Sequence, residues 1–410
     1  MADTKRPHVY GTVLDTLRQR LAEPPSHRVQ LLAGPRQVGK TTLLLELERS
    51  WPTTAIYAAA DAPAAALPGW WDNLWARAER AEQGAPVLVL LDEIQHLTDW
   101  SRLLKTKIDE LARREQPVHI VATGSSALTL GHGTHETMAG RFERLQLVHW
   151  QAAELAARFN LTPAEAAELA VRYGGYPGAV GLRHEPSRWR AYVRDAIVAP
   201  AIGRDLLTIE RIRKPALLRQ VYAVAVGHPA QIVSLQKIRG QLRDRGALET
   251  IAQYLSLLED AFLVAALPKH AGTVVRQRAA PPKLVALNNA LLASALDTDP
   301  PTATHQPERW GRWVENACIA MAWNRGQTVR YWRREPIEVD FVTTGSWGSW
   351  AVEVKTGTYG PNALRGVLAF CRDHPDFRPV ILCDPGRETV TIEAGVRALP
   401  WPDYLHRGLA

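Results

Sequence analysis

The segment Gly34-Pro35-Arg36-Gln37-Val38-Gly39-Lys40-Thr41 restricts the possible folds of this chain more than any other feature. It matches the phosphate-binding pattern G-x-x-x-x-G-K-[ST], which needs a strand before it and a helix after it. The apolar run 29–33 and the leucine-rich run 41–47 have those characters. We therefore expect a parallel α/β sheet in which the loop amides and the helix N-terminus face a phosphate. An accidental glycine-rich turn is the alternative, and the flanking runs disfavour it.

The residues of this loop have separate predicted roles. Gly34 and Gly39 let the backbone approach a ligand without a Cβ clash. Lys40 is expected to reach the β- and γ-phosphates of ATP, and the Thr41 hydroxyl is expected to bind Mg²⁺. The predicted nucleotide-contacting residues of this segment are Gly34, Pro35, Arg36, Gln37, Val38, Gly39, Lys40, Thr41 and Thr42.

A second motif follows at a suitable distance along the chain. The continuous apolar run 86–91 is typical of a parallel strand buried on both faces, and it ends in Asp92-Glu93. Asp92 is predicted to hold Mg²⁺ through water, and Glu93 to polarise the attacking water. Taken alone, the pair fits a solvated acidic strand end equally well. The phosphate loop upstream favours the catalytic interpretation.

Two later positions extend the predicted nucleotide site. The apolar run 118–122 ends in Thr123-Gly124-Ser125-Ser126, where Ser125 is predicted to sense the γ-phosphate. A Ser/Thr turn or helix N-cap is the alternative. Arg141 follows in the next loop and is predicted to act as an arginine finger on a neighbouring subunit, which implies a homo-oligomer. A plain surface arginine is the alternative there.

Composition sets broad limits on class and compartment. A chain of 410 residues with 46% hydrophobic and 22% charged residues is expected to form two or three globular domains. Its net charge of +7 permits contact with DNA without establishing it. Three cysteines without a C-x-x-C pair argue against a disulfide framework or structural zinc, and favour the reducing cytoplasm. No apolar stretch approaches the roughly 18 residues that span a membrane, and the start lacks a signal-peptide core.

The middle of the chain is predicted to be mainly helical. Residues 163–171 are good helix formers with Thr162 placed as cap, and the Gly-Gly-x-Pro element that follows either closes over an adenine or joins two helices. Helices are expected at 232–239 and 251–259, and a wing strand at 261–267. Helix–turn–helix–wing is a DNA-binding layout, although winged helices also join proteins.

The last third of the chain predicts a second site. Glu315 lies on an expected helix, Asp340 in an alternating strand, and Glu353 and Lys355 in the next strand. The three carboxylates are suited to Mg²⁺, and Lys355 shares a strand face with Glu353, where it can position water. An edge strand with a surface Glu–Lys pair is the alternative. Isolated charge in apolar strands is costly, which favours the functional interpretation.

With these motifs in place, the chain resembles prokaryotic AAA-type ATPases whose C-terminal domain looks like a PD-(D/E)xK nuclease. The resemblance spans nearly the whole chain. It rests on Gly34–Thr41, Leu91–Glu93, Thr123–Ser126, Ala139–Arg141, Tyr173–Pro177, Val339–Phe341 and Glu353–Gly357. It implies ATP binding and places Pro177 in the lid of the nucleotide site. One departure is that Val339, not proline, precedes Asp340; the nearest proline is Pro336.

Together these features predict an α/β chain of four segments. They are an ATPase core at 1–150, a helical lid at 151–211, a winged-helix-like module at 212–300 and a nuclease-like α/β domain at 301–410. Three functions remain open: an ATPase that controls a nuclease-like, DNA-contacting domain; a nucleotide-dependent signalling or assembly switch; and a DNA-anchoring protein with an inactive nuclease fold.

Overall fold

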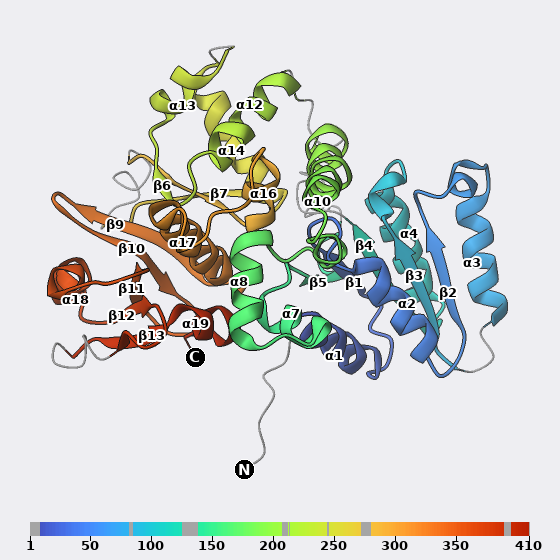
Figure 1. Cartoon of the computed structure of the whole chain (residues 1–410). Coiled ribbons are helices and arrows are strands. Elements are labelled where there is room, and N and C mark those ends of the chain that lie inside the picture. Colours follow the sequence, from blue (N-terminus) through green and yellow to red (C-terminus); the bar gives the residue numbers. More distant parts are fainter. Residues whose placement is uncertain are drawn as a thin grey trace. The chain divides into compact units, whose positions relative to one another are not determined.

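The computed structural model describes residues 9–81, 85–124, 138–206, 212, 214–243, 246–271, 280–388 and 395–409. They divide into two compact units, one holding the described residues up to Val148 and the other those from His149 onward. The elements of both are labelled in Figure 1.

Within the described residues, the first unit is built on a five-stranded sheet of order β2-β3-β4-β1-β5, with every neighbouring pair parallel. Its strands are β1 (Val29–Ala33), β2 (Ala55–Ala59), β3 (Val87–Asp92), β4 (Val118–Gly124) and β5 (Phe142–Gln146). Its helices are α1 (Val9–Leu21), α2 (Lys40–Ser50), α3 (Trp70–Ala81) and α4 (Trp100–Arg113), with short turns η1 (Pro63–Ala66) and η2 (Ile94–His96). The strands predicted at 29–33, 86–91 and 118–122 are confirmed.

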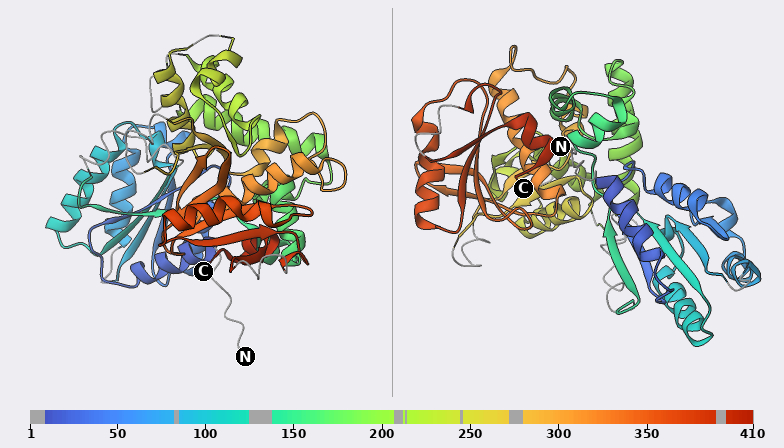
Figure 2. Two further views of the ribbon diagram at one scale, coloured as in Figure 1. Left: turned by 90° about the vertical axis from the view of Figure 1, so that its left-hand side faces the viewer. Right: turned by 90° about the horizontal axis from the view of Figure 1, so that it is seen from below.

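The helices cover both faces of this sheet, which explains its continuous apolar strands. Alternate residues of β3 face opposite ways: Leu88 and Leu90 pack with α1 and α2, whereas Val87 and Val89 pack with α3 and α4. The carboxyl ends of β1, β3 and β4 meet at one edge, and Figure 2 shows the sheet with its helices from two sides. By the same alternation, Asp92 points to the α2 face.

The second unit begins with helices. They are α7 (Ala152–Phe159), α8 (Pro163–Tyr173), α9 (Pro177–Val180) and α10 (Pro186–Tyr192), followed by π-helical segments η3 (Val193–Val198) and η4 (Ala201–Asp205). The predicted cap of α8 is confirmed, because the Thr162 hydroxyl accepts from the Glu165 N–H at 3.3 Å and the Glu165 carboxylate accepts from the Thr162 N–H at 2.8 Å.

A three-stranded antiparallel sheet and its helices come next. They are α12 (Pro215–Val226), β6 (Gln231–Ile232), α13 (Leu235–Gln241), α14 (Leu248–Asp260), β7 (Val264–Leu267), β8 (Lys283–Ala286) and α16 (Asn289–Ser294). The helix predicted at 232–239 was misplaced. Ile232 pairs with Lys283 in the sheet, and the helix starts only after Ser234, whose hydroxyl accepts from the Lys237 N–H at 3.1 Å.

A mixed five-stranded sheet of order β13-β12-β11-β10-β9 completes the unit. Its elements are α17 (Pro307–Asn324), β9 (Thr328–Arg334), β10 (Ile337–Thr344), β11 (Trp350–Lys355), η5 (Pro361–Leu364), α18 (Arg365–Asp373), β12 (Arg378–Cys383), β13 (Arg397–Pro400) and α19 (Trp401–Arg407). Strands β9, β10 and β11 are antiparallel, and β11, β12 and β13 are parallel. None of the helices in the described part of the chain has the length and apolar character needed to cross a membrane.

Candidate functional site

The phosphate loop joins β1 to α2 at the carboxyl edge of the first sheet. Gln37 and Gly39 have positive φ angles of 61° and 102°, and left-handed residues among ordinary ones form concave nests of N–H groups that bind anions. A side chain at Gly34 would collide with the backbone oxygen of Leu147, so glycine is required there. Val38 is fully buried and anchors the loop in the core. The loop is therefore closely packed and has left-handed positions suited to an anion-binding nest.

Lys40 is buried against this loop. Its Nζ donates to the carbonyl oxygens of Gly34 (3.1 Å) and Pro35 (2.9 Å), and the residue is 5% exposed. These contacts hold the ammonium against the loop backbone. Thr41 and Thr42 follow in the first turn of α2 and are exposed, and Arg36 is half-buried.

Asp92 is the last residue of β3, and Glu93 follows it. The neighbouring strand in the sheet is β4. The buried Asp92 carboxylate accepts from the Tyr57 hydroxyl at 2.8 Å and from the Thr123 hydroxyl. Thr123 also accepts from the Glu93 N–H at 3.2 Å. Glu93 takes a left-handed conformation (φ 50°), and its carboxylate accepts from the Gln95 amide at 2.5 Å. One hydroxyl thus links the carboxylate of Asp92 to the backbone N–H of Glu93.

Thr123 and Tyr57 are not among the site residues that the sequence predicts. Burial and the hydrogen bond to Asp92 raise the pKa of Tyr57, so its hydroxyl stays a donor. Thr123 is the first polar residue after the apolar run 118–122, and this position could have identified it from the sequence. The sequence analysis instead predicts a nearby serine as the residue that senses the γ-phosphate. That residue, Ser125, lies outside the described residues.

Arg141 lies at the other edge of the same sheet. The Val29 N–H donates to its carbonyl oxygen at 2.9 Å, which places it beside the start of β1. Its guanidinium pairs with Asp109 of α4 through Nε (2.7 Å) and a second nitrogen (3.3 Å). This hydrogen bond lowers the pKa of Asp109. Because the phosphate loop follows the end of β1, about 13 Å away for a strand of this length, Arg141 does not face the loop of its own chain.

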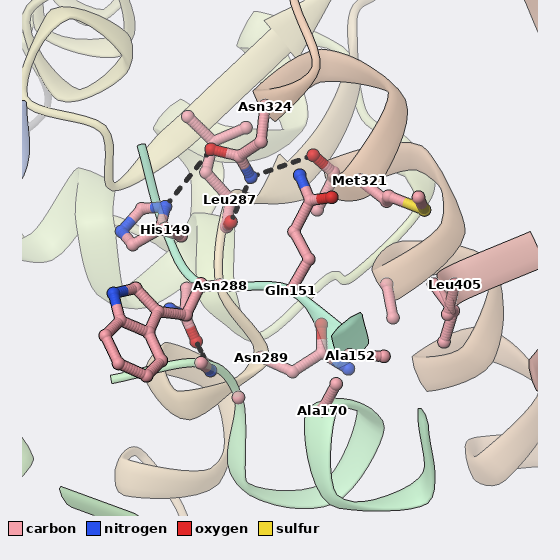
Figure 3. Close-up of a pocket in the computed structure, with 15 residues that line it drawn as sticks. His149, Gln151, Ala152, Ala170, Leu287, Asn288, Asn289, Met321, Asn324 and Leu405 are labelled. Atoms are coloured by element: carbon pink, nitrogen blue, oxygen red, sulfur yellow. Dashed lines mark hydrogen bonds between the residues drawn. The ribbon is translucent and has the colours of Figure 1, made fainter. Parts of the chain in front are cut away.

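The Gly-Gly-x-Pro element lies in the second unit. Pro177 opens α9 and is half-buried, while the two glycines pack against the chain: a Cβ at Gly174 would strike Asn288 and one at Gly175 would strike Trp150. The Gly175 N–H donates to Asn288 Oδ1 at 3.1 Å. A cavity of ≈ 40 Å³ beside them is too small for a nucleotide (Figure 3).

Buried polar groups surround this cavity. His149 contacts Asn324 (3.3 Å) and the Tyr176 hydroxyl (3.1 Å), and the Asn324 amide donates to the carbonyl oxygens of Leu287 and Ala320. Burial lowers the pKa of His149 to about 4, so the ring is neutral. In this unit, the glycines serve close packing around a polar core, and a role for Pro177 at the nucleotide remains a prediction.

The structure brings the predicted residues of the C-terminal sheet together. Asp340 and Glu353 lie opposite each other, one step beyond the paired residues Phe341 and Val352 of β10 and β11. Asp340 Oδ2 accepts from the Val354 N–H at 2.8 Å, and Lys355 Nζ lies 2.5 Å from Glu353 Oε1. The pairing of β10 with β9 shifts between Val339 and Val342, so that a β-bulge lies at Asp340.

Glu315 of α17 reaches the same place, together with a lysine that the sequence argument missed. Lys283 Nζ contacts Glu315 Oε1, donates to the Asp340 carbonyl oxygen at 2.8 Å and lies 4.0 Å from Asp340 Oδ1. Burial, and then the charge of Asp340, raise the pKa values of Glu315 and Glu353. Burial alone would lower the pKa of Lys283. The charges of Glu315 and Asp340 outweigh this effect, and the pKa of Lys283 is raised. In the sequence, Lys283 is a single charged residue directly before an apolar run, and this pattern could have identified it as a candidate site residue.

These side chains do not leave an obvious place for a metal ion. Among the residues described, no group of three or more His, Cys, Asp or Glu side chains is arranged to hold one. Lysine ammonium groups instead contact Glu315 and Glu353. The predicted Mg²⁺ ligands Asp340, Glu353 and Glu315 therefore meet, but with Lys283 and Lys355 among them.

Three family models match successive parts of the chain. An AAA domain matches residues 26–156, and two domains of unknown function match residues 165–302 (DUF8612) and 310–404 (DUF4143). Two uncharacterized proteins, from Mycobacterium tuberculosis and Mycobacterium bovis, are each 25% identical over 400 residues, which cover 96% of this chain and 83% of the relative.

Solved structures give weaker likenesses. The Aeropyrum pernix Orc1 protein in complex with DNA is 16% identical, with 72% of this chain and 94% of that chain covered and a TM-score of 0.34. Thermotoga maritima RuvB is 21% identical, with 63% and 87% covered and a TM-score of 0.30. At these scores the likenesses carry no argument about function. The AAA-domain match coincides with the five-stranded parallel sheet and its phosphate loop, so the first unit contains the part of the chain that matches an AAA domain.

Proposed function

We propose that this protein hydrolyses ATP with Mg²⁺ in its first unit and uses the nucleotide state to control a nuclease-like, DNA-contacting second unit. The proposal of ATP hydrolysis rests on one observation. The Thr123 hydroxyl forms hydrogen bonds with both Asp92 and Glu93 beside the phosphate loop. Two successive acidic residues at the carboxyl edge of a sheet, the first held through its carboxylate and the second through its backbone N–H, are suited to nucleotide hydrolysis.

The residues present fit ATP·Mg²⁺. The loop offers left-handed positions for phosphate binding, Thr41 is an exposed residue, and Asp92 is a carboxylate fixed by two donors. Thr41 and Asp92 would hold the ion, which would neutralise charge on the phosphates. Lys40 binds the β/γ-phosphates, Glu93 orients and polarises the attacking water, and Ser125 contacts the γ-phosphate.

The second half of the proposal rests on the arrangement of the C-terminal sheet. A helix glutamate, a strand aspartate and a strand Glu-x-Lys meet as in a nuclease core, and the protein carries a net charge of +7. The module from α12 to β8 combines helices with a small antiparallel sheet, and we infer that it is winged-helix-like and contacts DNA. The three free cysteines suit the cytoplasm.

The nuclease-like site does not fit catalysis by a divalent cation in the arrangement described. Lys283 contacts two of the three residues that would ligate the ion. We therefore derive no phosphodiester cleavage from this site, and DNA binding rather than DNA cutting is the function proposed for the second unit.

One experiment tests the whole proposal: ATP hydrolysis and DNA cleavage measured side by side, with and without Mg²⁺ and DNA. We expect Mg²⁺-dependent hydrolysis that DNA stimulates, and uncut DNA. Absence of hydrolysis under every condition would refute the ATPase. Very slow hydrolysis, indifferent to DNA and accompanied by nucleotide-dependent assembly, would instead identify a switch.

A further inference from the structure

A lysine from outside the C-terminal sheet enters its carboxylate cluster. Lys283 begins β8, the central strand of the three-stranded sheet, where it pairs with Ile232 on one side and Leu267 on the other. Its side chain is 5% exposed, in contrast to the freely moving lysines of a protein surface. Strand pairing on both sides fixes the backbone from which the ammonium reaches Glu315 and Asp340.

The two lysines of the cluster have different partners. Lys355 bonds Glu353, its neighbour on the same strand, at 2.5 Å. Lys283 contacts Glu315 and takes the Asp340 carbonyl oxygen at 2.8 Å, with Asp340 Oδ1 at 4.0 Å. Three oxygens from two elements therefore surround one ammonium, as they would surround a small cation.

The bulge at Asp340 accounts for part of this geometry. An extra residue in one strand of a pair releases backbone groups from the regular ladder. Here Asp340 and Phe341 stand against a single residue of β9, and the Asp340 carbonyl oxygen bonds Lys283. Backbone carbonyls and carboxylates are the oxygen donors of hard-cation sites, and in this protein both kinds converge on Lys283.

Charge explains why this ammonium and a divalent ion exclude each other. With all three carboxyl groups ionised, the buried cluster would carry a net charge of −1, and the raised pKa values of Glu315 and Glu353 make it less negative still. Adding a divalent cation would place two like-charged centres within contact distance, which is strongly unfavourable at low dielectric. Removing Lys283 would leave Glu315 and Asp340 with Lys355, which bonds Glu353, as their counter-charge, and a buried site tolerates such an excess of negative charge poorly.

We propose that the Lys283 ammonium is the resident cation of the Glu315–Asp340–Glu353 site, and that a divalent cation binds there only when this ammonium is removed. A strand of the preceding module thereby supplies the charge that a metal ion would otherwise supply to the C-terminal sheet. The assignment needs neither ATP hydrolysis nor DNA binding.

The test is a Mn²⁺ titration of the full chain without nucleotide or DNA, with free Mn²⁺ followed by electron paramagnetic resonance. The Lys283→Met variant removes the charge and keeps the length of the side chain. It should gain one bound Mn²⁺ per chain, which the added Asp340→Asn change should abolish. Lys237→Met, at an exposed position of α13, is the matched control and should behave as the wild type does.

A folded Lys283→Met protein, checked by circular dichroism, that gains no Mn²⁺ would overturn the proposal. So would a wild-type protein that binds Mn²⁺ and loses it through Asp340→Asn. If Lys283→Met does not fold, the last comparison decides alone: equal Mn²⁺ responses of wild type and Asp340→Asn support the resident ammonium, and unequal responses refute it. Because nucleotide and DNA are absent, these outcomes are independent of the proposed ATPase.

Discussion

Thr123 connects the two acidic residues of the nucleotide site. Its hydroxyl donates to Asp92 and accepts from the Glu93 N–H. We predict that Thr123→Val, which keeps the shape and removes the hydroxyl, lowers ATP turnover about 10- to 100-fold, as loss of an orienting partner does at metal sites. ATP affinity should change little, because Lys40 and the loop are untouched. Steady-state kinetics and nucleotide binding measure both effects.

The conservative control is Thr123→Ser, which retains the hydroxyl and should keep most of the turnover. Equal loss in both variants would mean that the methyl group, and therefore packing, accounts for the effect. Unchanged turnover in Thr123→Val would show that Asp92 and Glu93 need no common hydrogen-bond partner.

Single residues could be predicted where a motif fixes their place, and not where only tertiary contact does. Gly34 and Lys40 follow from local pattern, because a phosphate loop needs them at fixed spacing, and Asp92 follows from its place at the end of an apolar run. Thr123 and Lys283 act through partners 31 and 57 positions away in sequence. The sequence contains both partners of each contact, but it does not show that they lie close together in space.

At the scale of elements, the turn at Gly174 and Gly175 has no space for side chains. A Cβ on Gly175 would collide with the Trp150 carbonyl oxygen, and Gly174 combines a collision at Asn288 with a φ of 71°. We predict that Gly175→Ala lowers the free energy of unfolding of the second unit by about 3 kcal/mol or more. Chemical denaturation, with hydrogen exchange on α16 and α17, measures it.

The matched control is Gly181→Ala in the same region. Gly181 has helical backbone angles and nothing within 4 Å of an added Cβ, so alanine should leave stability unchanged or raise it by up to about 1 kcal/mol. Similar behaviour of the two variants would show that the Gly-Gly turn relaxes and is not a packing constraint.

Helices and strands with a clear hydrophobic pattern could be predicted from the sequence, but the strands with which they pair could not. Three strands of the first sheet, β1, β3 and β4, follow from apolar runs, and the capped helix α8 follows from Thr162. The misplaced helix at 232–239 shows the limit, since helical spacing there was outweighed by pairing of Ile232 with Lys283, a residue far along the chain. Likewise, the sequence predicts that Asp340 lies on a strand. It does not predict the β-bulge at this residue, because the bulge depends on how the strand pairs with β9.

At the scale of the whole molecule, the position of Arg141 bears on assembly. It lies beside Val29, at the edge of the sheet away from the phosphate loop, and is held by Asp109. A catalytic role therefore requires the loop of another chain. We predict that Arg141→Ala lowers turnover by about a thousandfold or more, as loss of an arginine finger does, with little loss of ATP binding.

Mixing experiments separate this role from structural effects. Combining Arg141→Ala with Lys40→Ala protein should partly restore turnover, because one supplies an intact loop and the other an intact arginine. Asp109→Asn breaks the ion pair but keeps the arginine, and should retain activity. A fully active, monomeric Arg141→Ala protein would exclude action between subunits.

Parallel measurements of ATP binding and turnover on two variants test most directly whether the first unit binds and hydrolyses ATP through Lys40 and Glu93. Lys40→Ala should lose ATP binding or turnover, because the charge on the β/γ-phosphates is gone. Glu93→Gln should bind ATP as the wild type does and turn it over about 10²- to 10⁴-fold more slowly, since only water activation is lost. Wild-type affinity and hydrolysis in Lys40→Ala, or undiminished turnover in Glu93→Gln, would contradict the account.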